Sequence, residues 1–569
     1  MADINTRVIF LIDGLGCILL AVFAHEIGLD PTPNWGTGRF GLLVSGSLLI
    51  CIFLAWSFFT SGAQRFSGYI KSETTKNLFA LIHLWGIIFL VYAWFVTYGN
   101  FTTWDHTTRY YTQLADAFGK GHLYVDLKPG KALAEAADPY HPTDRPPFND
   151  ELWDMSLYKG RLFLYWGPVP ALLIVPVQLF LTKRITDNYL VFFFFAALLI
   201  VNSLIILKLQ RRFFRDLPAW IVLISMTLIG LILPVSWSLS TPNVYEAAIG
   251  AGQFFLLGGI YFIISALEPD GTLNKKYLFL AGVFWSCTVG SRAINVFSVI
   301  FLAALTSLWI AKRSAKPFRW PEFFRALVPL FLPLILGALL IVWYNWARFD
   351  SPFEFGLRYQ ITIFNLNKDM DLVFRPEYFF LNTYIYIFQP FQVIPKFPFI
   401  QPMIGSATLN QHGIVTPFLY AAGPATGLLF CAPFLAFSLT HLFSGNMKSR
   451  IGRFFNNPQP YDFILCLLAG SFLMNFLYIL LCFFGQMRYL VDVISQITLL
   501  AILGYWQILS RKRDANFIHP KAVVFLANSL VVCSIGASLL LALTGEANRM
   551  LTLNPALFDW VNSVLSMPK

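Results

Sequence analysis

The stretch from Tyr189 to Leu209 reads YLVFFFFAALLIVNSLIILKL and carries one charged side chain, that of Lys208. A helix needs roughly 20 predominantly apolar residues to cross the roughly 30 Å of hydrocarbon in a bilayer. Stretches that approach or reach this length recur at Val8 to Phe23, Leu42 to Phe59 and Leu78 to Val96, and onward to the end of the chain. We therefore predict a chain that crosses a membrane many times as α-helices.

The composition of the whole chain agrees with this interpretation. Of its 569 residues, 57% are hydrophobic and only 12% are charged, which is not the composition of a soluble domain. Membrane proteins concentrate Lys and Arg in cytoplasmic loops, so the net charge of +11 gives no reason to expect a nucleic acid partner. The seven cysteines show no CxxC spacing, which argues against a disulfide framework or a zinc site.

The apolar stretches predict an all-α polytopic membrane protein with about 12–14 transmembrane helices. The stretch 278–311 is too long for one span and has basic clusters at both ends. We expect two short helices there that meet at Gly290-Ser291-Arg292 and return to the same side. The spans are placed near 8–24, 41–60, 78–98, 188–207, 219–239, 247–267, 278–311, 325–345, 418–442, 461–484, 489–508 and 519–542.

One apolar stretch, 165–182, is expected not to cross. It contains Pro168, Pro170 and Pro176, which remove backbone donors and bend a helix. If it crossed, every later basic cluster would face outward, against the usual distribution of Lys and Arg. We therefore expect a re-entrant or interfacial segment, a cytoplasmic N-terminus and an outer C-terminus.

This topology divides the chain into four parts. Residues 1–77 form two N-terminal helices, and 78–345 form a transmembrane core that includes a first large loop, 99–163. Residues 346–417 form a second large loop, and 418–569 form C-terminal helices with a short outer tail. Both large loops fall on the outer face, and their mixture of aromatic and charged residues predicts short amphipathic helices within them.

Asp105 lies just beyond the third span, in Thr103-Trp104-Asp105-His106. A carboxylate at the outer membrane surface could take a proton from an acceptor hydroxyl or hold a divalent metal, and either role would assist attack on an activated sugar carbon. The alternative is that Asp105 caps the helix that follows it.

A second group, Asp154, Lys159 and Arg161, immediately precedes the proline-rich segment and should lie near the membrane interface. Lys and Arg bind phosphate by charge, and Arg also in a bidentate fork. Ordinary anchoring of the chain at the interface is the alternative.

Arg292 stands among apolar residues at the turn of the expected hairpin. An unpaired guanidinium there costs several kcal/mol, so it needs a partner or a water-filled cavity. A phosphate-bearing ligand and a buried carboxylate are the two alternatives.

Further ionisable and aromatic residues are expected to converge on the outer face, beside the ends of the spans. We count among these site candidates His106, Tyr110, Asp154, Tyr165, Glu246, Tyr344, Arg348, Arg358, Tyr359, Arg488 and Asp492.

The order of these features resembles the GT-C class of glycosyltransferases, and within it the bacterial relatives of family 39, the protein mannosyltransferase and aminoarabinose transferase group. The resemblance covers about residue 78 to the end. It rests on an acidic residue that opens the first large loop and on a series of short motifs. These motifs are the segments 110–121 and 156–170, Gly290-Ser291-Arg292, 344–349 with 351–356, and Arg488-Tyr489-Leu490-Val491-Asp492.

The resemblance implies an inverting transfer of a sugar from a polyprenyl-phosphate donor to a glycan, lipid or protein acceptor at the outer face of a bacterial plasma membrane. Asp105 would be the catalytic acidic residue, and Arg292, Lys159, Arg161 and Arg488 would bind the donor phosphate. A divalent cation (Mg, Mn or Zn) would be held by Asp105 and Asp154.

Two features depart from the family. The loop begins with Asp105-His106 where the family often has Asp-Glu, and two additional helices precede the usual first span. The competing hypotheses are a transporter or flippase of lipid-linked saccharides, and a ligase or polymerase that uses a polyprenyl-pyrophosphate donor. The long loops on one face and the lack of a visible internal repeat favour the enzyme.

Overall fold

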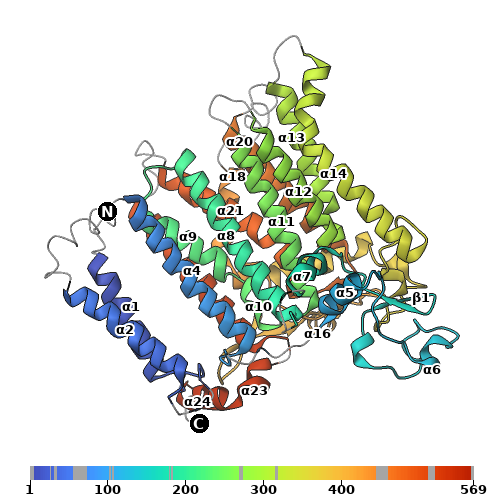
Figure 1. Ribbon diagram of the computed structural model, residues 1–569, viewed down its shortest axis with the longest axis horizontal. Coiled ribbons are helices and arrows are strands. Elements are labelled where there is room, and N and C mark those ends of the chain that lie inside the picture. Colours follow the sequence, from blue (N-terminus) through green and yellow to red (C-terminus); the bar gives the residue numbers. More distant parts are fainter. Residues whose placement is uncertain are drawn as a thin grey trace.

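The protein is an α-helical polytopic membrane protein, as predicted. The computed structural model describes residues 6–25, 27–30, 32, 35–55, 73–101, 104, 108–178, 180, 184–267, 273–313, 318–443, 459–510, 520–546 and 548–565. Figure 1 shows its long helices running between two ends of the molecule. Eight of the described helices are long and apolar enough to cross a membrane, as judged by length and composition. They lie in α4 (Glu73–Thr97), α8 (Asp187–Phe213), α11 (Val244–Ala266), α13 (Val296–Arg313), α14 (Trp320–Phe349), α20 (Pro460–Leu481), α21 (Val491–Ser510) and α22 (Pro520–Thr544).

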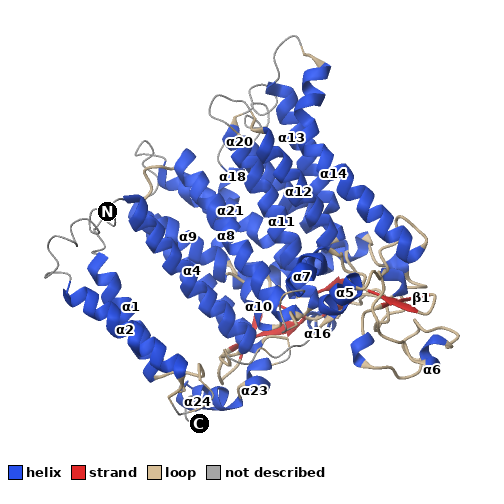
Figure 2. Ribbon diagram, viewed as in Figure 1, coloured by secondary structure: helices blue, strands red, loops and turns tan. Residues whose placement is uncertain are grey.

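The shorter helices and all the strands gather mainly at one end, which we call the loop end (Figures 1 and 2). The first large loop contributes α5 (Tyr110–Gly119), α6 (Lys131–Ala134) and the hairpin of β1 (Ser156–Tyr158) with β2 (Arg161–Phe163). The second contributes 3-10 turns, α15 (Phe379–Thr383), β3 (Phe391–Val393), β4 (Ile400–Ile404) and α16 (Gly405–Gln411).

The two large loops pack on each other and form one layer. The backbone N–H of Asp154 donates to the carbonyl of Ile361 (2.8 Å), and the N–H of Ile361 donates to the carbonyl of Met155 (2.9 Å). The hydroxyl of Ser156 adds a bond to the carbonyl of Gly356 (2.8 Å). Both loops therefore lie on the same side of the helical bundle.

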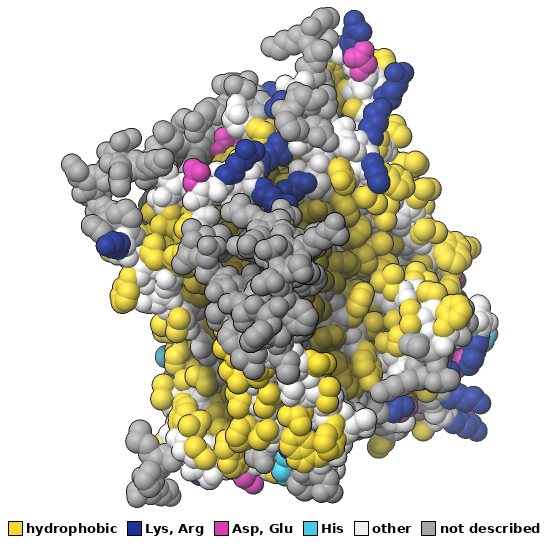
Figure 3. Space-filling view, turned by 60° about the vertical axis from the view of Figure 1, so that its left-hand side comes forward, with side chains coloured by type: hydrophobic (Ala, Val, Ile, Leu, Met, Phe, Trp, Pro, Cys, Tyr) yellow, Lys and Arg dark blue, Asp and Glu magenta, His cyan; other side chains and the backbone are white. Residues whose placement is uncertain are grey.

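The opposite end of the bundle is basic. Figure 3 shows Lys and Arg side chains gathered over the ends of the helices there. Basic residues at this end of the chain's helices include Arg211, Arg212, Lys275, Lys276, Lys312, Arg313, Arg319 and Arg325, at the end of α8, the start of α12 (Lys275–Ser291), the end of α13 and the start of α14.

The predicted hairpin in 278–311 is confirmed. α12 (Lys275–Ser291) ends at Arg292, a 3-10 turn (Ala293–Asn295) follows, and α13 then runs back. The turn is tight because Gly290 packs against the segment that leads into α7, where a Cβ at Gly167 would run into the carbonyl of Gly290.

The proline-rich segment gives α7 (Val169–Gln178), a ten-residue helix. At about 1.5 Å per residue it covers about half the thickness of the hydrocarbon. It packs against α5 of the first loop, and so lies at the loop end, as expected for a segment that does not cross.

Two predicted spans are not continuous helices. The span at 219–239 breaks into α9 (Ala219–Leu231) and α10 (Val235–Ser240) at Pro234, which cannot continue the hydrogen-bond ladder. The prediction of one helix over 418–442 is wrong. There the chain forms β5 (Ala421–Ala422), β6 (Pro424–Ala425), α17 (Leu428–Cys431), a 3-10 helix (Pro433–Leu439) and α18 (Thr440–Phe443). Pro424 and Pro433 lack backbone donors, and β5 and β6 pair with β7 (Phe484–Gly485) and β4 instead.

The N-terminal pair, α1 (Thr6–Val22) and α2 (Thr37–Ala55), packs closely where Gly14 faces Gly46. It meets the rest of the bundle through an ion pair in which the Nε2 of His83 on α4 lies 2.5 Å from an oxygen of Asp13 on α1. The Nδ1 of the same histidine faces the carbonyl of Phe79 at 2.8 Å.

The last part of the chain covers the loop end of α4. Beyond α22 lie α23 (Arg549–Leu553) and α24 (Pro555–Leu565). The amide of Asn100 donates to the carbonyl of Leu553 (2.8 Å), and the amide of Asn554 donates to the carbonyl of Tyr98 (2.9 Å). Tyr98 is fully buried in a cluster with Phe397, Met550 and Leu557.

Candidate functional site

Asp187, at the first turn of α8, fixes the start of the first large loop. Its buried carboxylate accepts the hydroxyl of Thr108 (2.6 Å) and the backbone N–H groups of Tyr110 (3.0 Å) and Tyr111 (3.1 Å). The oxygen of Thr108 in turn accepts the N–H of Val244 (3.0 Å) at the start of α11. A carboxylate on the free N–H groups of a helix N-terminus is stabilising, so Asp187 holds α5 against the beginnings of α8 and α11.

Asp105 and His106 lie outside the described residues. The nearest described residues on either side are Trp104, whose ring stacks on Tyr189 with centroids 4.6 Å apart, and Thr108, which Asp187 holds. The catalytic assignment of Asp105 stays a prediction.

Asp154 is a buried carboxylate where the first loop meets the bundle. It receives hydrogen bonds from the hydroxyls of Tyr245, at the start of α11, and of Thr362, in the second loop. Its backbone has φ 61, a left-handed conformation that is uncommon for a residue other than glycine. Burial raises the pKa of Asp154 to about 6, although the bond from Thr362 and the charges of Arg488 and Arg145 act to lower it.

Arg488, just before α21, lies beside Asp154. Its guanidinium carbon stands 4.2 Å from the centre of the Tyr245 ring, and Tyr245 donates to Asp154. Its Nη1 lies 3.9 Å from an oxygen of Glu246 and 3.5 Å from an oxygen of Glu546. Its Nε is buried and has no hydrogen-bond partner among the residues that the structure describes. We call Asp154, Glu246, Arg488 and Glu546 the charge cluster.

The two glutamates of the charge cluster differ in how firmly their side chains are held. Glu246 is 1% exposed and also belongs to the capping box of α11, in which its Oε2 accepts the N–H of Asn243 (3.2 Å). Glu546 is 31% exposed and follows Gly545, which has a positive φ. Glu546 is therefore the partner of Arg488 that can move away at lower cost.

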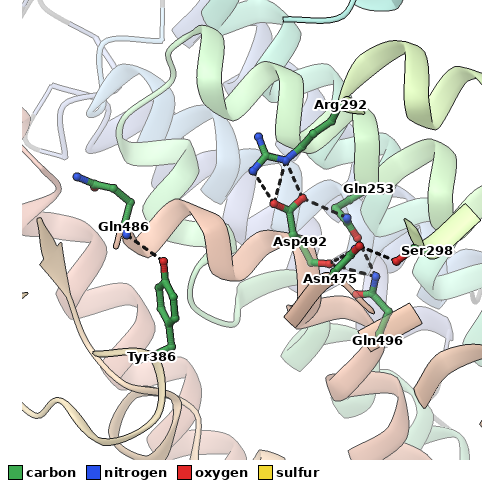
Figure 4. A network of polar contacts seen from close by, with 8 residues as sticks. All are labelled: Gln253, Arg292, Ser298, Tyr386, Asn475, Gln486, Asp492 and Gln496. Atoms are coloured by element: carbon green, nitrogen blue, oxygen red, sulfur yellow. Dashed lines mark hydrogen bonds and ion pairs between the residues drawn. The ribbon is translucent and has the colours of Figure 1, made fainter. Parts of the chain in front are cut away.

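Arg292 forms an ion pair with Asp492 inside the bundle, which is the second of the two alternatives that the sequence left open (Figure 4). Its Nε lies 3.0 and 2.9 Å from the two carboxylate oxygens, and its Nη2 lies 2.7 Å from Oδ2. A role for Arg292 in binding phosphate stays a prediction.

The pair is embedded in a network of neutral polar side chains from four helices (Figure 4). The amide of Asn475 donates to the carbonyl of Asp492 (2.8 Å), and Ser298 donates to the oxygen of Asn475 (2.6 Å). Gln253 approaches Asp492 at 3.4 Å and accepts a bond from Gln496 (3.0 Å).

Aromatic side chains join the ion pair to the charge cluster. The ring of Tyr489 is near both arginines, with its centre 5.5 Å from the guanidinium carbon of Arg292 and 5.7 Å from that of Arg488. Burial raises the pKa of Tyr165 well above its ordinary value, and the charges that act on it include Asp154, Arg292 and Arg488. The ionisable residues at 154, 292, 488 and 492 thus form one continuous region.

Two predicted phosphate ligands lie apart from this region, on the exposed β1–β2 hairpin. Lys159 is 69% exposed, and its Nζ is 2.7 Å from an oxygen of Asp350. Arg161 places its guanidinium over the ring of Tyr124, 4.6 Å from its centre.

Other candidates hold the fold. Arg348 is buried at the end of α14 and donates to the carbonyl of Leu164 (2.6 Å) and to the side chain of Asn345 (2.8 Å), with its guanidinium carbon 3.8 Å from the centre of the Tyr344 ring. The remaining candidates also contact neighbouring parts of the two large loops. Tyr110 donates to the carbonyl of Trp153 (2.6 Å), Arg358 lies 3.9 Å from Glu354, and Tyr359 packs on Tyr140 and Tyr158.

The described residues contain no group of three or more His, Cys, Asp or Glu that could hold a metal ion. Asp154, one of the two predicted ligands, is already hydrogen bonded to Tyr245 and lies in the field of Arg145 and Arg488. Two positive charges oppose the approach of a divalent cation, so the surroundings of Asp154 do not suit a metal.

Sequence reasoning missed Asp187, Tyr245 and Glu546. An acidic residue directly before the apolar run of α8 was a signal for Asp187, because acidic residues favour helix N-termini. Tyr245 and Glu546 carry no local signal, since their partners lie 91 and 58 residues away in the chain.

No family model and no curated protein sequence match the chain. Solved structures similar to it include the apo oligosaccharyltransferase of Archaeoglobus fulgidus, with a TM-score of 0.45 and 12% identity over 81% of this chain and 55% of that one. The chain thus spans about half the length of that protein. They also include ArnT from Cupriavidus metallidurans bound to undecaprenyl phosphate, with a TM-score of 0.36 and 10% identity over 85% of this chain and 78% of that one. Both likenesses are distant.

The ion pair of Arg292 and Asp492 gives a first prediction. Arg292→Met leaves Asp492 buried and unpaired, and Asp492→Leu does the same to Arg292, so each is expected to destabilise by about 3–5 kcal/mol. The double variant should be more stable than either single one. Thermal unfolding in detergent of the parent, the two single variants and the double variant measures the coupling free energy between the two side chains. If the stability losses of the single variants simply add in the double variant, the pairing is contradicted.

Asp154 gives a second prediction, on pH. Its folded pKa of about 6 exceeds the ordinary 3.8, so its contribution favours folding at acid pH and is lost as the pH rises through 6, a cost of about 3 kcal/mol. Asp154→Asn should raise the melting temperature relative to the parent at pH 8 and change it little at pH 4, near the ordinary pKa of 3.8. Asp350→Asn, an exposed control, should show no such gain. A gain that is equal at both pH values would contradict the burial of an ionised carboxylate.

Proposed function

We propose that this chain is a membrane glycosyltransferase of GT-C type, which moves a sugar from a polyprenyl-phosphate donor to an acceptor hydroxyl at the loop end. The observation that carries the proposal is the buried guanidinium of Arg488 beside the buried carboxylate of Asp154; the Nε of Arg488 has no partner within the described part of the chain. An anion site and a carboxylate thus meet where the bundle joins its loop layer.

Arg488 is the proposed donor-phosphate ligand. A guanidinium binds phosphate through parallel N–H donors, and its Nε is a buried donor that still needs an acceptor. Leaving such a donor unpaired costs about 1–3 kcal/mol, which phosphate binding would recover. Glu546 shares this guanidinium and is partly exposed, so the incoming phosphate would displace Glu546 and keep Glu246 in place.

The proposed reaction is a single displacement that inverts the anomeric carbon. The acceptor oxygen forms a bond to that carbon, and the bond from the carbon to the phosphate oxygen breaks. The lipid phosphate leaves with the electron pair, and the acceptor proton passes to a carboxylate. Asp105 is the proposed base, because it matches the catalytic acidic residue of the family that the sequence resembles. Asp154 accepts the hydroxyl of Tyr245 and so positions the Tyr245 ring against Arg488.

The orientation follows from charge. Lys and Arg are concentrated at the end opposite the loops, which is the usual pattern of a cytoplasmic face. We therefore place the N-terminus in the cytoplasm and the C-terminus and the site on the outer face of a bacterial plasma membrane.

Substitutions of Arg488 and of Glu546 are predicted to have opposite effects on the binding of a lipid phosphate. Arg488→Gln should abolish binding of undecaprenyl phosphate, the lipid bound in the ArnT structure. Glu546→Gln removes the group that competes for the guanidinium, so it should tighten binding by about fivefold. Binding is measured by native mass spectrometry or by the shift in melting temperature. Glu377→Gln, on an exposed pair with Arg375, is the matched control. Unchanged or weaker binding by Glu546→Gln would contradict the proposed displacement.

The role of Asp105 has its own test. Asp105→Asn should retain the melting temperature and the binding of undecaprenyl phosphate, yet lose transfer of a labelled sugar from lipid-linked donors in membranes. Asp126→Asn, an exposed carboxylate of the same loop, is the control and should remain active. Full activity of purified Asp105→Asn in reconstituted membranes would exclude Asp105 as the base.

A further inference from the structure

A groove with a volume of ≈ 370 Å³ lies at the loop end, between the second large loop and the end of α22. One side comes from β3, β4 and α16, and the other from Thr544, Gly545, Glu546 and Asn548. Its size falls within the range of small-molecule sites, roughly 300–1,000 Å³.

The chemistry of the groove is polar and mostly neutral. Four carboxamide side chains, those of Gln392, Gln401, Gln411 and Asn548, line it together with the hydroxyl of Thr408. The amide of Gln401 donates to the oxygen of Gln392 (2.9 Å), which holds these two side chains next to each other across β3 and β4. Each amide carries both donors and an acceptor, which suits the hydroxyl and acetamido groups of a carbohydrate.

The charge of the lining restricts the ligand. No Lys, Arg or His occurs among the described residues that line the groove, and Glu546 is its one charged group. A phosphate or carboxylate would meet a negative charge and no cation. The lining therefore favours an uncharged, hydroxyl-rich ligand.

Glu546 also ties the groove to the charge cluster. The same carboxylate that lines the groove contacts the Nη1 of Arg488 at 3.5 Å. A molecule in the groove would thus have one end next to the proposed donor-phosphate site, and it would enter from the loop side, where Gln392 and Gln411 are exposed.

We propose that the groove binds the uncharged saccharide part of the acceptor. That this saccharide belongs to the acceptor depends on the proposed function, whereas the carbohydrate site itself is argued from the lining of the groove alone.

The test uses the full chain in nanodiscs, with N,N′-diacetylchitobiose and cellobiose as probes and saturation-transfer NMR as the readout. Ala407 lines the groove and is exposed on α16, so Ala407→Trp should fill the groove without disturbing the core. Asn410, exposed on the same helix and absent from the lining, gives the matched control Asn410→Trp. We expect a saccharide signal in the parent and in Asn410→Trp, and its loss in Ala407→Trp.

Binding of undecaprenyl phosphate is measured on the same samples. If the parent binds the saccharide and Ala407→Trp loses it, the groove site is supported, even where the parent itself does not bind the lipid phosphate and the proposed transfer falls. If the parent gives no signal with either saccharide, or Ala407→Trp keeps the signal, the groove proposal is overturned. A loss of lipid-phosphate binding in Ala407→Trp together with the saccharide would also overturn it, because the substitution would then have disturbed more than the groove.

Discussion

A guanidinium inside a membrane must have a partner, and the pairing of Arg292 with Asp492 is the constraint on which the bundle depends. The arginine stands at the turn between α12 and α13, and the aspartate at the start of α21. Their bond fixes the depth of the hairpin relative to a helix 200 residues further along the chain. Side chains of α11, α13 and α20 form further polar contacts around Asp492, so five helices are registered at one level.

The loop layer depends on this bundle and in turn completes the candidate site. The two large loops exchange backbone hydrogen bonds at Asp154, Met155 and Ile361, and this pairing holds Asp154 in its left-handed conformation under the start of α11. The charge cluster draws its members from the first loop, α11, the turn before α21 and the turn after α22. None of these segments could form the site alone, because each supplies a single charged group.

Much of the architecture could be predicted from hydropathy, since membrane spans carry a strong local signal. The hairpin at Gly290 to Arg292 followed from the excess length of its apolar stretch. The irregular segment at 418–442 was missed because apolar composition does not report backbone pairing with β4 and β7. Asp154, Lys159 and Arg161 were singled out together from their position before the proline-rich segment, yet Asp154 is buried against the bundle whereas Lys159 and Arg161 lie on an exposed hairpin. Tyr245 and Glu546 could not be predicted, because their roles arise from partners that are close in space only.

The contact between α4 and the end of the chain bears on how the protein is made. The loop end of α4 leaves the ribosome early, yet its carbonyl at Tyr98 and its amide at Asn100 are satisfied by Asn554 and Leu553. Until those residues are synthesised, these two groups have to form hydrogen bonds with water, lipid headgroups or a membrane chaperone. The early helices can therefore insert in order, but their final arrangement is reached only after synthesis of almost the entire chain. The last hydrogen bonds at the loop end of α4 therefore form only after most of the chain has been translated.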